Sequence, residues 1–220
     1  ASLPWEVLDT SSAELSGSDP RPWAIRSKLL RKLRTKEFRA QVSDATADGS
    51  ILVIGEPMVD DQQYPPLPGA RAEAIAVATR LTSGPAGVDA TRVRALTSGN
   101  DDARNIINAL FERPYRIVHV AGHGAPGPDG GVVLSGGTYL GAAEVKAMRV
   151  VPELVFLNCC HLAALDAKTV LAPYDRAEFA ATIAEALIEV GVRCVIAAGW
   201  AVEDKPAELF ATTFYDALLS

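Results

Sequence analysis

Two short segments of the sequence carry the side chains that nucleophilic hydrolysis requires. His123 lies between two glycines at the end of an apolar run, and Cys160, preceded by Cys159, follows another such run. Only a thiolate attacks a carbonyl well, and a free thiol with a pKa near about 8.5 is mostly protonated at neutral pH. A nearby imidazole can take that proton and later return it to a leaving amine. The two segments therefore indicate acyl-transfer chemistry by a cysteine–histidine pair.

Such chemistry also needs hydrogen-bond donors for the oxyanion that forms on the substrate. Gly124 follows the histidine directly, and a residue without a Cβ lets its backbone N–H approach a substrate closely. A nucleophile at a strand-to-helix junction gains further N–H donors from the turn that follows it, which lower its pKa and bind the oxyanion. We therefore expect the N–H groups of Gly124 and Cys160 to form an oxyanion hole.

Strands and helices alternate from Ser50 onward and must bring these segments together. The hydrophobic patterns predict strands over 51–54, 93–96, 116–121, 154–157 and 192–197, and helices over 70–81, 101–111, 142–148, 176–190 and 203–219. A Gly-Gly pair predicts a hairpin between 132–134 and 138–140. Repeated strand–helix units demand a mostly parallel sheet with helices on both faces. We predict an α/β fold whose strands have the order 2-1-3-4-5. Neighbouring strand ends, about 4.8 Å apart, then place His123 beside Cys160.

Composition and charge indicate a cytoplasmic protein that does not bind nucleic acid. The net charge is −6, and the basic residues concentrate in a helical pattern over 23–39, so the remainder of the chain is acidic. There are three cysteines, two of them adjacent, which is not a disulfide framework. The first residues have neither the basic nor the apolar region of a signal peptide, and no apolar run is long enough to span a bilayer, so we expect neither feature. We expect a strap or linker with the basic helix over 1–49 and one catalytic domain over 50–220.

The residues around His123 and Cys160 resemble those of a known family. The segments Val118 to Gly124 and Leu154 to Cys160 are similar to the His-Gly and Ala-Cys boxes of CHAT domains, bacterial relatives of caspases and separases. The likeness extends over roughly residues 51–219 and includes 67–74, 140–145, 179–190 and 199–202. It implies a caspase-like three-layer sandwich and a cysteine endopeptidase without a cofactor. In that endopeptidase Cys160 is the nucleophile and His123 its partner. It also implies that the substrate is a protein or peptide, that the peptidase activity is regulated, and that the domain is part of a larger bacterial protein.

The substrate pocket of such a fold is built at the strand ends. We expect it to be lined by the five residues Asp60, Asp61, Tyr64, Leu67 and Trp200. Leu67 stands where caspases carry an aspartate-binding arginine, so an apolar residue before the scissile bond is favoured over a basic one, and an acidic one is disfavoured. The nearby Arg71 is expected to pair with Glu73 and to be structural.

Three alternatives compete with the peptidase hypothesis. The same fold can serve as a catalytically inactive interaction or scaffold module. A different flavodoxin-like hydrolase or nucleotide binder is disfavoured, because residues 55–57 hold too few glycines for a phosphate cradle. A zinc site would draw on His119, His123, Cys159, Cys160 and His161. Their spacing matches no recognised zinc pattern, so we predict no metal. His119 and Cys194 are expected in the core.

Overall fold

The computed structural model describes residues 49–60, 64–83, 87–125, 130–148, 150–162, 173–198 and 202–219, without the side chains of 160–162 and 173–178. The chain divides into two units, Ala1–Arg34 and Thr35–Ser220, and every described residue belongs to the second. The expected strap, linker and basic helix before Gly49 therefore lie outside the described residues. So do two of the expected pocket residues, Asp61 and Trp200.

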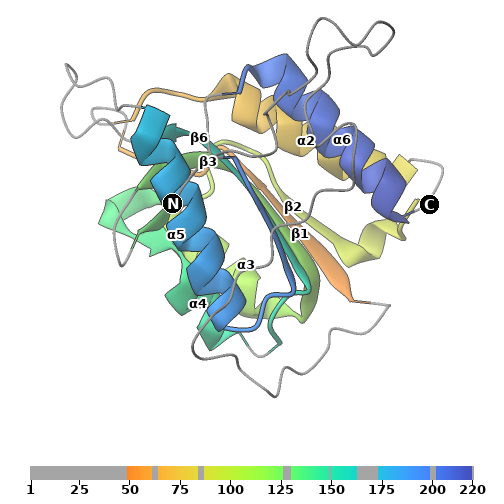
Figure 1. The fold of residues 1–220 in the computed structure, drawn as a ribbon. Coiled ribbons are helices and arrows are strands. Elements are labelled where there is room, and N and C mark those ends of the chain that lie inside the picture. The colour runs from red at the N-terminus through yellow and green to blue at the C-terminus, as the bar shows by residue number, and fades with distance from the viewer. Residues whose placement is uncertain are drawn as a thin grey trace, which may run out of the picture. The chain divides into compact units, whose positions relative to one another are not determined.

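Five parallel strands form the body of the sheet (Figure 1). They are β1 (Ser50–Gly55), β2 (Val93–Leu96), β3 (Tyr115–Ala125), β6 (Leu154–Leu162) and β7 (Cys194–Ala197). Their pairings give the order β2-β1-β3-β6-β7. This is the order 2-1-3-4-5 predicted for the five strands counted along the sequence, and it makes β3 and β6 neighbours.

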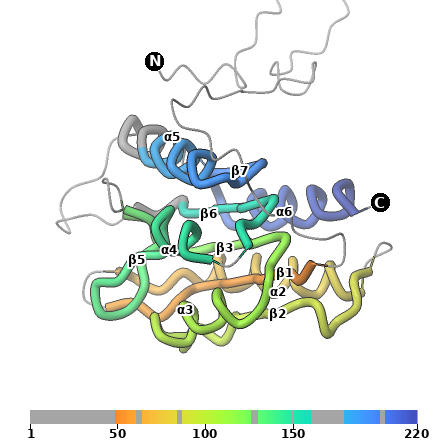
Figure 2. The backbone as a smooth tube through the Cα atoms, turned by 90° about the horizontal axis from the view of Figure 1, so that it is seen from below, coloured from red at the N-terminus to blue at the C-terminus, as the bar shows by residue number. Residues whose placement is uncertain are grey.

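Five helices cover the two faces of the sheet, as Figures 1 and 2 show. They are α2 (Pro68–Ser83), α3 (Ala103–Glu112), α4 (Ala142–Ala147), α5 (Pro173–Glu189) and α6 (Asp204–Leu219). One apolar cluster joins the sheet to α2 and α6, and the other joins it to α3, α4 and α5. The result is a three-layer α/β/α sandwich, which agrees with the predicted fold class.

The strands contribute side chains to both apolar clusters, because successive residues of a strand point to opposite faces of the sheet. On β1, Leu52 and Ile54 enter the cluster with α3 to α5, while Ile51 and Val53 enter the cluster with α2 and α6. All four side chains are buried. A strand buried on both faces reads as a continuous apolar run, which is why residues 51–54 could be identified from the sequence.

The predicted hairpin is confirmed. Strands β4 (Gly131–Val133) and β5 (Tyr139–Leu140) pair antiparallel, and β4 in turn pairs with the last residues of β3. The connecting turn holds Gly136 at φ 66° and Gly137 at φ 69°. These left-handed values are costly for residues with a Cβ, which explains the two adjacent glycines.

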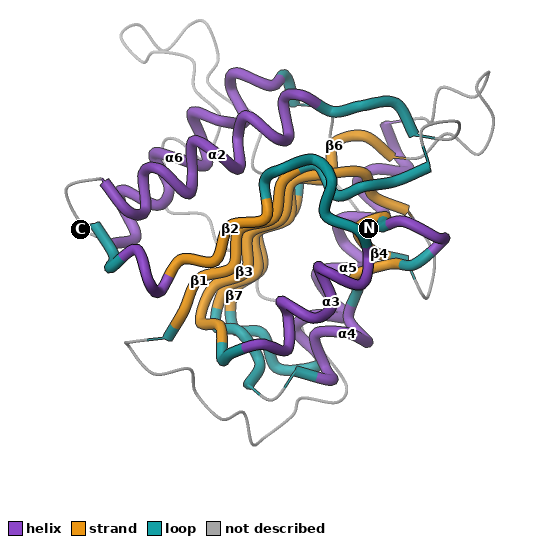
Figure 3. Tube along the Cα trace, turned by 180° about the vertical axis from the view of Figure 1, so that it is seen from behind, coloured by secondary structure: helices purple, strands orange, loops and turns teal. Residues whose placement is uncertain are grey.

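Two strands are longer than the sequence pattern predicts. The apolar run of β3 ends near Ala121 and that of β6 near Leu157, but the strands continue to Ala125 and Leu162. Figure 3 shows the sheet nearly edge-on, with α2 and α6 on one side and α3, α4 and α5 on the other. The extension of β3 is paired on one side by β6 and on the other by β4. These pairings satisfy backbone groups that the polar and glycine-rich sequence would otherwise leave to a loop.

Tyr115, at the start of β3, places a polar hydroxyl group in the apolar core. Its ring is fully buried, and its hydroxyl has no hydrogen-bond partner among the described residues. Burial, with a smaller contribution from Glu112, raises the pKa of Tyr115 to about 12. An unfolded tyrosine ionises near pH 10, so unfolding releases a proton above that pH.

We predict that the free energy of unfolding falls between about pH 10 and pH 12, and that Tyr115→Phe reduces this fall. At pH 7 the same substitution should change stability by less than about 1 kcal/mol, because no hydrogen bond is lost. Urea denaturation from pH 7 to 11.5 measures both effects. A large loss of stability in Tyr115→Phe at pH 7 would show that the hydroxyl has a partner after all.

Candidate active site

His123 lies within the extension of β3 rather than on a loop, and its side chain is only 5% exposed. Its Nε2 lies 2.8 Å from the carbonyl oxygen of Pro65. A carbonyl oxygen only accepts hydrogen bonds, so the neutral ring carries its proton on Nε2 and its lone pair on Nδ1. The Pro65 carbonyl thus orients the imidazole, as the third member of a catalytic triad does.

Tyr64 packs against the same imidazole. The ring centroids of Tyr64 and His123 lie 5.2 Å apart with the planes at 52°. A hydrogen bond of 2.9 Å from the Tyr64 N–H to the Asp60 carbonyl closes a turn in the loop between β1 and α2. Partial burial, followed by Tyr139 and Asp60, raises the pKa of Tyr64. The neutral phenol therefore covers part of the histidine without adding a charge.

The cysteine pair lies on β6, directly beside this part of β3. In the strand register His161 is opposite His123, so the backbone of Cys160 passes next to the histidine. The Cys159 side chain is 2% exposed and belongs to the cluster on the α5 side of the sheet. It is a core residue. The Cys160 side chain is outside the described set, and its distance to His123 stays a prediction.

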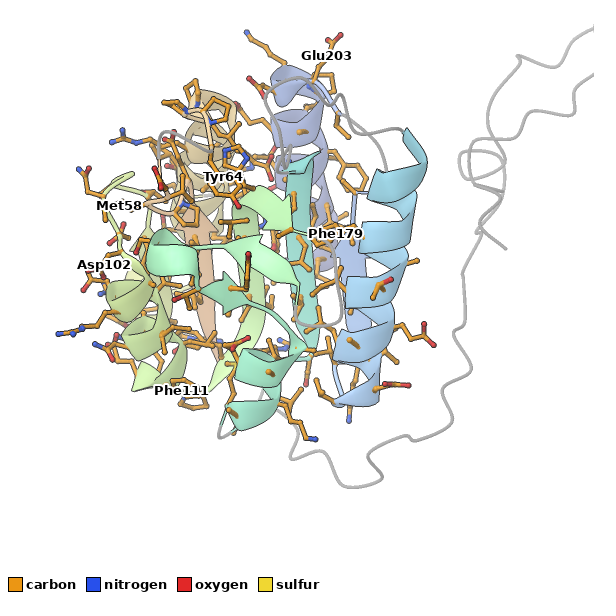
Figure 4. The ribbon with its side chains drawn as sticks, turned by 90° about the vertical axis from the view of Figure 1, so that its left-hand side faces the viewer. Met58, Tyr64, Asp102, Phe111, Phe179 and Glu203 are labelled. Carbon is orange, nitrogen blue, oxygen red and sulfur yellow. The ribbon has the colours of Figure 1, made fainter. Side chains whose placement is uncertain are left out.

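Gly124 has a packing reason for lacking a side chain. A Cβ at this position would lie 2.8 and 2.9 Å from two ring carbons of Phe179 and 3.1 Å from the Cβ of Cys159. Figure 4 shows Phe179 between α5 and the sheet. The glycine therefore lets α5 approach the sheet where the His-Gly and cysteine segments meet.

A buried polar network lies beneath the site. The Glu73 carboxylate on α2 is 1% exposed and accepts a short hydrogen bond from the Asn158 amide, two residues before Cys160. Its other oxygen lies 3.3 Å from Nε2 of His119, although the two atoms are not aligned as a hydrogen bond. His119 is fully buried, and its Nδ1 lies 3.2 Å from the Tyr215 hydroxyl on α6. The network ties α2, β3, β6 and α6 together.

Glu73 is a residue that the sequence analysis assigned wrongly. It was expected to pair with Arg71, but its carboxylate points into the core, and Arg71 instead donates its Nε–H to the Thr97 carbonyl at 3.0 Å. The sequence does hold a signal for this. Glu73 interrupts the apolar stripe of α2 formed by Ala74, Val77 and Leu81, so helical periodicity turns it toward the sheet.

A pocket of about 410 Å³ opens beside His123. Its wall is formed by 56–59, 65–67, Arg71, 98–100, Gly122 and His123. Of the expected pocket residues, Leu67 contributes to the wall, whereas Tyr64 packs on the histidine and Asp60 is not part of the wall. Met58 and Tyr64 appear at the same end of the sheet in Figure 4. Arg71 and Glu56 supply the charges of the pocket, although Arg71 was expected to be structural.

Within the described residues, no three His, Cys, Asp or Glu side chains converge as a metal site would require. The zinc hypothesis also draws on Cys160 and His161, whose side chains are not described. No described helix is both long and apolar enough to cross a membrane.

The buried network leads to a stability prediction. Glu73→Ala leaves His119 and Asn158 without their acidic partner, so we expect a loss of about 3–5 kcal/mol in the free energy of unfolding. Glu73→Gln keeps an oxygen for the Asn158 amide and should lose less. Chemical denaturation at pH 7 measures both variants. The matched control is Glu189→Ala, which removes an exposed glutamate at the end of α5. Equal stability of Glu73→Ala and this control would show that the network does not hold the helices to the sheet.

Comparison with known proteins identifies the family. A family model for the CHAT domain matches residues 1–220. No curated protein and no solved structure matches the chain. The family match confirms the resemblance drawn from the segments around His123 and Cys160, and the strand order is consistent with a caspase-like sandwich. The chain belongs to the CHAT domain family, which is related to the caspase-like cysteine peptidases.

Proposed function

We propose that the chain is a cysteine endopeptidase in which Cys160 is the nucleophile and His123 the acid/base partner. The observation that carries this proposal is the hydrogen bond between His123 Nε2 and the Pro65 carbonyl. It places the proton of the neutral ring on Nε2, so Nδ1 is the nitrogen proposed to accept the thiol proton. The register of β3 and β6, which brings the Cys160 backbone next to the histidine, supports the same pairing.

The proposed reaction has two halves. Nδ1 of His123 takes the thiol proton, and the Cys160 sulfur attacks the carbonyl carbon of the scissile bond. The N–H groups of Gly124 and Cys160 donate to the resulting oxyanion. When the C–N bond breaks, Nδ1–H protonates the leaving amine and a thioester remains. Water, deprotonated by the same nitrogen, then hydrolyses the thioester and restores the thiol.

The buried network has a supporting role in this proposal. The Asn158 amide lies two residues before the nucleophile and is held by Glu73, while His119 lies four residues before His123 on β3. A carboxylate, an amide and an imidazole in the core restrict both strands to one arrangement. The acid/base group and the nucleophile segment are thus anchored to the same side chain of α2.

An inactive interaction module of a larger cytoplasmic protein is the second candidate. The observation that favours it is the burial of His123, which is 5% exposed and covered by Tyr64. In this case the pocket beside the histidine would bind a peptide or a neighbouring domain without cleaving it. The two candidates differ in the reactivity of the Cys160 thiol.

We predict that iodoacetamide modifies Cys160 faster than Cys159 or Cys194 at pH 7, with a pH midpoint below the free-thiol value of about 8.5. Cys194 is the matched control. It was expected in the core, but it is exposed at the start of β7, the edge strand of the sheet. Partial burial of its thiol raises the pKa of Cys194. Mass-mapped labelling gives the three rates. His123→Ala should raise the midpoint of Cys160. Faster labelling of Cys194 would contradict an activated thiol at position 160.

Cleavage of a peptide library by the purified chain tests the activity itself. We expect cleavage that is lost in Cys160→Ala and reduced by at least about 100-fold in His123→Ala, because general acid–base catalysis contributes on the order of 10²–10⁴-fold. Cys194→Ala should retain full activity. If the reactive thiol is confirmed but no peptide is cleaved, the inactive interaction module is the better description.

A further inference from the structure

We propose that the pocket beside His123 selects a carboxamide side chain, glutamine or asparagine, next to the scissile bond. The inference rests on the proposed function, because it places this side chain relative to Cys160. It is carried by the two opposite charges in the pocket wall, Arg71 and Glu56, and by their arrangement around one glycine.

Arg71 presents a cation to the pocket. Its Nε–H is bound to the Thr97 carbonyl at 3.0 Å, which fixes the direction of the guanidinium. Glu73, the nearest acidic residue along the helix, is turned into the core and bound to Asn158. Among the described residues, Arg71 forms no ion pair. The nitrogens beyond Nε are therefore available to an acceptor on a ligand.

Glu56 presents an anion to the same pocket. One carboxylate oxygen, Oε1, accepts the Leu67 N–H at 2.7 Å and so holds the wall of the pocket in place. The backbone of Glu56 has φ 50°, a left-handed value that is unfavourable for a residue with a Cβ. Strain of this kind persists where the surrounding structure fixes a side chain at a site. The second oxygen, Oε2, is the remaining acceptor.

The two charged groups converge on Gly99. A Cβ built on that glycine would lie 3.4 Å from Nη1 of Arg71 and 3.5 Å from Oε2 of Glu56. The two side chains nevertheless form no ion pair with each other in the described part of the chain. One donor and one acceptor thus border the same small region of the pocket, with room for a polar group between them.

Charge decides which group fits there. An acidic side chain would be attracted by Arg71 and repelled by Glu56, and a basic one would meet the reverse. An apolar side chain would desolvate both charges without replacing their hydrogen bonds. A carboxamide carries an acceptor oxygen for Arg71 and, on a separate atom, a donor NH₂ for Glu56, so of these four classes it is the one that satisfies both charges at no net charge. The neighbouring Pro65 and Leu67 offer apolar surface to its methylene groups.

Peptide binding to the Cys160→Ala chain tests the inference without requiring cleavage. Four fluorescent peptides differ only at the residue before the scissile bond, which is Gln, Glu, Lys or Met. We expect the Gln peptide to bind about tenfold more tightly than each of the others in an anisotropy titration, since one lost pair of buried hydrogen bonds changes affinity on that scale. Equal binding of all four, tighter binding of Met, or no binding at all would overturn the inference.

Two conservative variants then test the assignment of each charge. Glu56→Gln retains an oxygen for the Leu67 N–H but removes the anion, so the preference should move from Gln toward Glu. Arg71→Gln removes the cation and should move the preference toward Lys. Arg104→Gln and Glu189→Gln, which alter exposed charges outside the pocket wall, should leave the order unchanged. An unchanged order in both pocket variants would refute the assignment.

The same four peptides, incubated with the native chain, separate this inference from the proposed function. Selective binding of the Gln peptide without cleavage of any peptide would sink the peptidase proposal and leave the pocket assignment intact. Cleavage that ignores the identity of the varied residue would do the opposite.

Discussion

The buried carboxylate of Glu73, which binds the Asn158 amide and lies 3.3 Å from His119, is the constraint around which the site is arranged. A carboxylate and an imidazole that are almost fully covered cost desolvation free energy, and this cost is met only when their partners are in place. The partners come from two further positions: Asn158 on β6 and the Tyr215 hydroxyl on α6. Burial raises the pKa of Tyr215 well above its usual value, so the phenol remains neutral. The network therefore permits one arrangement of α2 and α6 on the sheet.

The position of α2 affects the site because the loop that leads into this helix makes two contacts there. Its Pro65 carbonyl orients His123, and its Leu67 N–H binds Glu56 in the wall of the pocket. The first turns of α2 then supply Arg71 to the pocket and Glu73 to the core. A displacement of this helix would alter both the tautomer control of the histidine and the charge pattern of the pocket. The proposed recognition and the proposed acid/base chemistry thus depend on the same few residues of backbone.

The candidate site residues lie within paired strands, which hold them more rigidly than loops at the strand ends would. His123 and the cysteine pair lie inside paired strands, and the β4–β5 hairpin takes over where β1 stops. Because the segment with Cys159 and Cys160 is part of the sheet, backbone hydrogen bonds rather than loop packing hold it beside His123. Gly124 is needed for this arrangement, because a side chain at that position would prevent α5 from approaching the extended strands.

The sequence by itself determined the fold class, the five parallel strands and their order, because continuous apolar runs and strand–helix alternation leave few topologies. It also predicted the turn at Gly136 and Gly137, and it singled out His123 and Cys160 as a candidate pair, through residue types with local requirements. Only the tertiary structure decided that Glu73 faces the core and that Pro65 orients the histidine. The same holds for Arg71 and Glu56, which meet around Gly99. These are contacts between residues far apart in the chain, and no local periodicity encodes which carbonyl or carboxylate a folded backbone brings to a given side chain.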